Sequence, residues 1–213
     1  MLVRLIYQYV VGYVMECITK SNEKLEIMID ESCESPREWD NLTVIVTIKN
    51  NHNTIGDFQV NDSEELREML EGHKAKYAMP LYVYEHSGIS LKCFEDKVGY
   101  PYNDQWDAGC IGMVYTTKKL LKDNGLDKYP KDKVIEQMKT EIETYSQWCN
   151  GECYGFRLSE WSKCDKCNQL EDKEIDSCFG YYGYDHDKNG LYDAVLENSK
   201  VFKTYKDIEE LLS

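Results

Sequence analysis

The 213-residue sequence is poor in basic residues: 25 lysines and arginines stand against 39 aspartates and glutamates, and the formal net charge is −14. The acidic excess is spread over both halves of the chain. Such a surface repels phosphate backbones, which argues against ordinary nucleic-acid binding. The charge suits a protein that binds a basic partner, and it also suits one that needs only to be soluble.

The sequence also lacks the common enzyme signatures. It contains no phosphate-binding loop, no dinucleotide fingerprint, no Gly-x-Ser-x-Gly elbow and no His-Glu-x-x-His. No repeat with a period of about 20–50 residues is present, which excludes a solenoid. With four prolines and no Pro- or Gly-rich linker, we expect residues 1–213 to form one domain.

A long apolar run is absent as well. Residues 1–20 are rich in apolar side chains, but Arg4, Gln8 and Glu16 interrupt them, and no small-residue cleavage site follows. The run is too short to span a bilayer, so we expect one or two buried strands there. Nine cysteines without a cleavable signal favour a reducing compartment with mostly free, buried thiols. We therefore predict a cytoplasmic protein.

The apolar patterning predicts an α+β fold, with a mostly antiparallel sheet packed against one long and several short helices. Runs of β-branched and apolar residues between polar turns predict strands at Leu25–Ile29, Leu42–Ile48, Leu81–Tyr84, Cys110–Tyr115, Cys153–Leu158 and Glu174–Cys178. Helical spacing and capping residues predict helices at Glu64–Glu71, from Thr116 or Thr117 to Asn124, at Pro130–Asn150 and at Asp207–Leu212. Pro80 is expected at the start of its strand, where a missing N–H is tolerated.

The best candidate for a metal site is the pair Cys164 and Cys167, because this spacing lets both sulfurs reach one tetrahedral zinc ion. Cys178 lies on the next predicted strand and could return to the pair across a hairpin whose tip spans residues 160–172. The alternative is a hairpin tip that carries free thiols.

Residues Asp185–Gly190 resemble the first half of a calcium loop. Leu196, however, occupies the twelfth position, where such a loop needs a bidentate acid. An Asp/Asn/Gly turn that leads into a helix explains the same residues, so we do not expect calcium.

One histidine, His86, stands at the end of a predicted strand, a place where catalytic residues often occur. A thiol, Cys93 or Cys110, beside His86 and either Asp104 or Asp107 would supply a nucleophile, a base and an orienting acid. The alternative is a histidine that hydrogen-bonds a turn.

Six ordered motifs resemble those of a family of small proteins carried by phages and integrative elements of Firmicutes. They are Ser35–Asn41 (SPREWDN), Pro80–Ile89 (PLYVYEHSGI), Trp106–Gly109 (WDAG) with Gly112–Tyr115, Glu141–Tyr145 (EIETY), Gly151–Phe156 (GECYGF) and Asp176–Gly183 (DSCFGYYG). The chain departs from the family pattern at Gln105, where the family has Pro, and at Phe179, where it has Trp. Residues 1–21 look additional. The resemblance implies an accessory gene of a mobile element and brings no catalytic residues with it.

These observations favour an inhibitor of a host defence system, such as a CRISPR effector or a restriction complex, that blocks a basic nucleic-acid channel by charge mimicry. The acidic segments Asp30–Asp40, Asp62–Glu71 and Asp207–Glu210 are the candidate surfaces, and tyrosines would add contact area. The predicted partner-binding residues are Asp62, Glu64, Glu65, Glu68, Tyr82, Tyr84, Tyr181 and Tyr182.

Two other functions stay open. One is an enzyme built around His86 with a nearby thiol or acid. The other is a protein that sequesters a nucleotide signal, which would need basic and aromatic residues around a pocket. Arg37, Arg67 and Arg157 are the only arginines besides Arg4, so this second alternative has few candidates for phosphate contacts.

Overall fold

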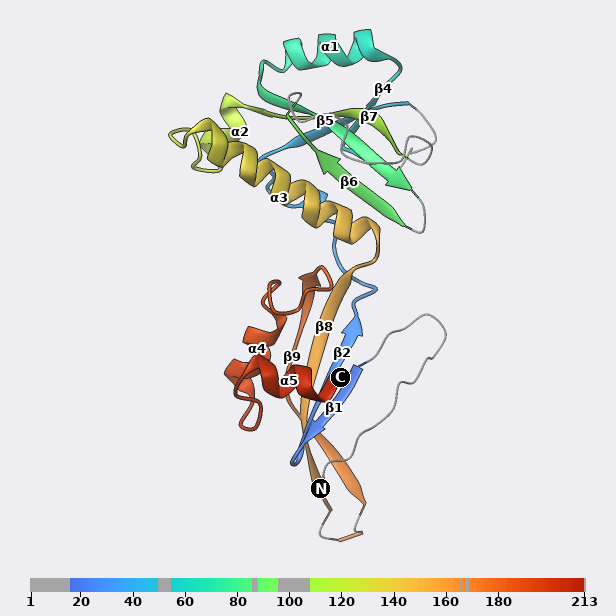
Figure 1. Ribbon diagram of the computed structural model, residues 1–213, viewed down its shortest axis with the longest axis vertical. Coiled ribbons are helices and arrows are strands. Elements are labelled where there is room, and N and C mark those ends of the chain that lie inside the picture. Colours follow the sequence, from blue (N-terminus) through green and yellow to red (C-terminus); the bar gives the residue numbers. More distant parts are fainter. Residues whose placement is uncertain are drawn as a thin grey trace. The chain divides into compact units, whose positions relative to one another are not determined.

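The structure is a computed structural model that describes residues 16–49, 55–85, 88–95, 108–164, 166–167 and 169–212 (Figure 1). The described residues divide into two compact units, and the chain passes between them after Glu34 and after Asn150. The central unit comprises residues 35–150, and the terminal unit comprises residues 16–34 and 151–212. Helices and mostly antiparallel strands confirm the predicted α+β class. Within these ranges, no helix is both long and apolar enough to cross a bilayer.

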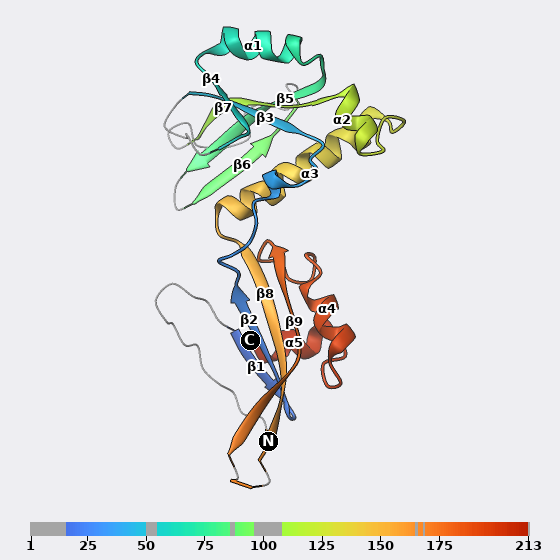
Figure 2. The ribbon, with the colours of Figure 1, turned by 180° about the vertical axis from the view of Figure 1, so that it is seen from behind.

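The central unit is built on a five-stranded sheet with the strand order β4-β3-β7-β5-β6 (Figures 1 and 2). Its strands are β3 (Val44–Ile48), β4 (Phe58–Val60), β5 (Ala75–Glu85), β6 (Ile89–Cys93) and β7 (Ala108–Thr117). Neighbouring strands are antiparallel except β3 and β4, which are parallel. A Cβ at Gly112 of β7 would lie 2.0 Å from the Val46 carbonyl oxygen, so glycine permits the close approach of β3 and β7.

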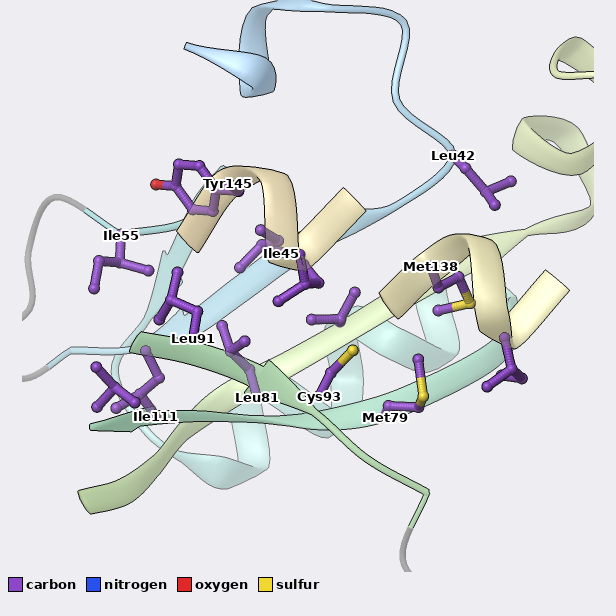
Figure 3. Packing of buried hydrophobic residues seen from close by; sticks show 14 of the residues in the cluster. Leu42, Ile45, Ile55, Met79, Leu81, Leu91, Cys93, Ile111, Met138 and Tyr145 are labelled. Atoms are coloured by element: carbon purple, nitrogen blue, oxygen red, sulfur yellow. The ribbon is translucent and has the colours of Figure 1, made fainter. Parts of the chain in front are cut away.

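Helices cover both faces of this sheet (Figure 1). The helical segments of the central unit are η1 (Pro36–Glu38), α1 (Ser63–Gly72), α2 (Lys118–Asp123) and α3 (Lys131–Cys149). Met138 and Tyr145 of α3 pack with Met79, Leu81 and Cys93 of the strands in one buried apolar layer (Figure 3). A second buried layer lies under α1 and consists of Val46, Val60, Leu66 and Tyr115.

The long helix and its shorter neighbour follow the predicted signals. Buried residues of α3 recur at the predicted three- and four-residue steps, from Val134 to Tyr145. Thr117 caps α2, since its hydroxyl accepts a hydrogen bond from the Leu120 N–H at 3.2 Å. Asn124 ends α2 as predicted.

The terminal unit has a four-stranded antiparallel sheet with the order β1-β2-β8-β9. Its elements are β1 (Glu16–Lys20), β2 (Glu23–Ile29), β8 (Cys153–Lys163), β9 (Leu170–Tyr182), α4 (Leu191–Asn198) and α5 (Tyr205–Leu212). Both helices pack on one face of the sheet around a core of Leu25, Ile27, Phe156, Leu158, Leu191, Tyr192, Val195, Phe202 and Ile208.

The expectation for Pro80 is wrong. β5 begins at Ala75, so Pro80 lies inside the strand, opposite Met113 of β7. Pairing with β6 begins only at Leu81. The proline therefore precedes the part of β5 that has neighbours on both sides, which is why its missing N–H is tolerated.

Candidate functional site

The acidic helix α1 contacts the sheet of the central unit through a narrow row of apolar side chains. Leu66 is buried, and Met69 and Leu70 pack partly against the same cluster. At 100° per residue, Glu64, Glu68 and Glu71 fall on the opposite side. All of the predicted acidic contact residues, Asp62, Glu64, Glu65 and Glu68, are exposed.

Two of these carboxylates also hold the beginning of α1. The Asp62 carboxylate accepts hydrogen bonds from the N–H groups of Glu64 and Glu65, both at 2.9 Å. Glu65 accepts from the backbone and side-chain nitrogens of Asn61 at 2.7 and 2.8 Å. Both residues are therefore N-terminal caps as well as surface charges.

The charge of α1 is only partly neutralised within the helix. Arg67 forms ion pairs with Glu64 and, at 3.6 Å, with Glu71, and these carboxylates raise the pKa of Arg67. Such exposed pairs contribute little to stability. One guanidinium stands among five carboxylates in Asp62–Glu71, so the exposed side stays acidic.

Sequence reasoning missed an exposed aromatic ring beside α1. Phe58 on β4 is 48% exposed. Its ring meets His73, the residue that follows α1, edge-on at a centroid distance of 6.4 Å, and His73 contacts the buried Tyr115 hydroxyl. β4 has only three residues, too few to show a strand period. Phenylalanine is among the aromatic residues that are enriched at protein interfaces, so the exposed Phe58 ring is a candidate contact residue.

The four predicted contact tyrosines belong to different units. Tyr82 and Tyr84 are half-buried on β5 of the central unit and alternate with the buried Leu81 and Val83. They therefore lie on the sheet face opposite α3, which is the face that α1 covers.

The other two tyrosines end β9 of the terminal unit. Tyr181 packs against the core of that unit, and burial raises its pKa. Tyr182 donates a hydrogen bond from its hydroxyl to the Glu34 carbonyl at 2.7 Å, so it has a structural role there.

The other two predicted acidic surfaces are poorer candidates. Residues 30–40 are split between the units after Glu34. Asp207 forms an ion pair with Lys20 and accepts hydrogen bonds from the N–H groups of Lys203 and Thr204, both at 2.9 Å, and these contacts together lower its pKa. Asp207 thus holds the beginning of α5, and it is not part of a free acidic face.

Cys164 and Cys167 lie in the turn of the β8–β9 hairpin, as predicted. The Cys164 N–H donates to the Gln169 carbonyl at 2.9 Å, and hydrogen bonds from the backbone of Lys166 and Cys167 lower the pKa of the Cys164 thiol. Both residues are at least partly accessible.

The structure corrects the placement of Cys178. Cys178 pairs with Phe156 of β8, and β8 continues for seven more residues to Lys163, which directly precedes Cys164. At about 3.3 Å per residue, Cys178 lies about 23 Å along the sheet from the hairpin turn. It therefore does not share a metal site with Cys164 and Cys167.

A different group of three ligands is present in the terminal unit. One ligand atom from each of Asp30, Cys33 and Cys153 lies within 4.8 Å of the others, and no other such group of three or more occurs among the described residues. This group could hold a metal ion, but Cys33 and Cys153 are joined by a disulfide. The prediction of free thiols is therefore wrong for this pair.

Of the residues named for the enzyme alternative, the structure describes only the two thiols. His86, Asp104 and Asp107 lie outside the described residues. Cys93 is buried in the layer under α3, and burial raises its pKa to about 12, which suits an inert thiol. Cys110 is exposed and opposes Tyr82, so it is not on the α3 face that buries Cys93.

The three arginines that the structure describes, Arg37, Arg67 and Arg157, are each paired with carboxylates. Arg37 holds Asp57 through two hydrogen bonds of 3.0 and 2.6 Å in the central unit. Arg157 binds Glu26, Asp172 and Glu174 in the terminal unit, at 2.8–3.0 Å. Arg67 is likewise paired with Glu64 and Glu71 on α1, so each of these three arginines already has a carboxylate partner within its own unit.

Two of the resemblance motifs meet around Glu141 of α3. Its carboxylate accepts hydrogen bonds from the N–H groups of Leu42 and Thr43, at 2.7 and 3.0 Å, and from the Thr43 hydroxyl at 2.7 Å. The Arg37 guanidinium lies 4.0 Å from Glu141 and 6.0 Å from the centre of the Tyr145 ring. The motifs SPREWDN and EIETY thus share a structural role, which is to fix α3 to the chain that enters β3.

The segment that resembles half of a calcium loop is a turn into a helix, as predicted. The N–H groups of Lys188 and Asn189 donate to the Asp185 carbonyl, and Gly190, with φ of +88°, precedes α4. The Asp193 carboxylate, at the position of a ninth ligand, accepts from the Tyr205 hydroxyl.

Comparisons with protein-family models, with curated proteins and with solved structures find no match.

Proposed function

We propose that this chain is an accessory protein of a mobile element that acts, without catalysis, in the cytoplasm of a bacterial host. It inhibits a host defence system, such as a CRISPR effector or a restriction complex, by binding a basic surface that otherwise holds nucleic acid. The binding surface is the exposed side of α1, with Phe58 as an adjacent apolar anchor. The observation that carries the proposal is the exposed row of Glu64, Glu68 and Glu71, opposite the buried side of α1.

The spacing of charge along α1 supports mimicry of a nucleic acid. Ten helical residues span about 15 Å, at about 1.5 Å per residue. Five carboxylates and one guanidinium in Asp62–Glu71 leave roughly one net negative charge per 3–4 Å. One strand of DNA carries roughly one per 3.4 Å. A groove that tracks a phosphate backbone would therefore meet a similar charge density.

The proposed inhibition requires no metal ion. If thiolates of this chain bind an ion, we propose zinc in a structural role, because thiolate and carboxylate ligands suit a tetrahedral zinc site.

The first test is capture of the partner. Tagged protein is incubated with lysate of a host that expresses a defined defence complex, and bound proteins and small molecules are identified by mass spectrometry. The proposal expects a stoichiometric subunit with a basic nucleic-acid surface. A bound nucleotide would favour the sequestering alternative. If the tagged protein captures neither a protein nor a nucleotide, inhibition by direct binding is contradicted.

The second test locates the surface. The variant Glu64→Lys, Glu68→Lys, Glu71→Lys reverses the exposed side of α1 but keeps the caps Asp62 and Glu65. Its matched control is Asp132→Lys, Glu136→Lys, Glu143→Lys, which makes the same charge change at exposed positions of α3. We expect the first variant alone to slow association by at least tenfold, since exposed charges chiefly steer encounter. If both variants slow association equally, the interaction depends on net charge, and the proposal that α1 is the binding surface is contradicted.

A further inference from the structure

The ends of three strands in the terminal unit hold Asp30, Cys33 and Cys153 close together. Asp30 directly follows β2, Cys153 begins β8, and the Asp30 N–H donates to the Cys153 carbonyl at 2.8 Å. Tyr182, at the end of β9, pairs with Cys153 and donates to the carbonyl of Glu34, the neighbour of Cys33. Strand pairing therefore holds the backbone at Asp30 and Cys153, and the Tyr182 hydrogen bond holds the backbone next to Cys33, independently of the disulfide.

These residues also lie where the chain leaves and re-enters the terminal unit. The chain leaves the terminal unit after Glu34, the residue that follows Cys33. It returns to this unit after Asn150, three residues before Cys153. A bond between the two sulfurs therefore links the segment by which the chain leaves the terminal unit to the segment by which it returns, although the two cysteines are 120 residues apart in the sequence.

We propose that this link exists in two forms: a disulfide in the oxidised protein, and a zinc site of Cys33, Cys153 and Asp30 in the reduced protein. A dithiol reductant transfers two electrons and two protons to the disulfide. The S–S bond breaks, two thiols form, and the reductant becomes a disulfide. Zn²⁺ then replaces both thiol protons, which pass to solvent.

The ligand chemistry favours zinc. Two thiolates and a carboxylate supply three of the four ligands of a tetrahedral ion, and water can take the fourth place. Cys153 is only 2% exposed, whereas Asp30 and Cys33 are partly exposed. A buried sulfur with accessible partners gives the ion both a fixed ligand and a path of entry. In the reducing compartment that the cysteine content favours, the zinc form would replace the disulfide as the link.

The test compares metal binding by oxidised and reduced full-length protein. Protein purified in air should yield a Cys33–Cys153 linked peptide in a non-reducing digest and should bind no zinc at this site. After anaerobic reduction and addition of zinc, metal analysis should find one equivalent more than in the oxidised protein. Cobalt in place of zinc should give a thiolate-to-cobalt absorption band.

Variants locate the ion. Cys33→Ser should remove the extra equivalent. Asp30→Asn, which leaves both sulfurs in place, should weaken zinc binding by about tenfold or more. The matched control, Cys164→Ser with Cys167→Ser, should keep it. The proposal fails if reduced, folded wild-type protein takes up no additional zinc, or if the hairpin variant loses the equivalent while Asp30→Asn and Cys33→Ser retain it. None of these outcomes depends on the proposed inhibition.

Discussion

Replacing Glu141 by alanine should destabilise the central unit far more than an ordinary change on the surface of a helix. Its carboxylate accepts three hydrogen bonds from Leu42 and Thr43, whose exposed fractions are 1% and 2%. Water cannot easily replace this acceptor, and an unsatisfied buried donor costs about 1–3 kcal/mol. For two N–H groups and a hydroxyl that can rotate, we expect a loss of about 2–4 kcal/mol in the free energy of unfolding.

The matched control for this change is Glu143→Ala. Glu143 lies two residues further along α3 and is exposed, so the substitution removes the same charge with the same gain in helix propensity. It should change the free energy of unfolding by less than about 0.5 kcal/mol.

Urea unfolding gives the stability, and hydrogen exchange of peptides that cover Leu42–Ile48 shows whether the loss is local to the entry of β3. The reasoning is refuted if the variants at Glu141 and Glu143 unfold alike, or if exchange of the β3 peptide is unchanged in Glu141→Ala.

Three further predictions concern single residues. Gly112→Ala should lower the free energy of unfolding by about 1–3 kcal/mol because its Cβ would overlap the backbone of β3, whereas Gly109→Ala on the same strand meets no atom within 4 Å; equal urea midpoints would contradict this. Burial lowers the pKa of His186 below 6.5, so the unfolded state binds the proton first and stability should fall as pH drops below 6.5; His186→Gln should flatten that slope, and an unchanged slope would refute the assignment. Iodoacetamide at pH 8 should label Cys164, whose pKa is lowered, long before the buried Cys93; mass spectrometry that finds equal rates would contradict the described environments.

Local sequence signals were enough to predict the helices whose own residues show a periodic apolar side or capping residues. α3 shows its buried side in the spacing from Val134 to Tyr145, and α2 shows its beginning and end in Thr117 and Asn124. The exposure of α1 was also predictable, because an apolar side of three residues leaves the glutamates in solvent.

Features that depend on distant partners were not predictable. Asp207 looks like part of an acidic surface in the sequence, but its ion-pair partner Lys20 is 187 residues away. Cys33 and Cys153 are 120 residues apart, and no spacing rule connects them. The division into two units was not predictable from composition either, because no Gly- or Ser-rich linker marks the points after Glu34 and Asn150 where the chain passes between them.

The most direct measurement of the central claim is the plating efficiency of a phage on a host that carries a defined defence system targeting that phage. The account predicts that expression of the wild-type chain restores plating. The control variant with lysine at Asp132, Glu136 and Glu143 should do the same, and the variant with lysine at Glu64, Glu68 and Glu71 should not, although all three proteins are folded and equally abundant. Full restoration by the α1 variant against a system that the wild-type chain inhibits would contradict the account.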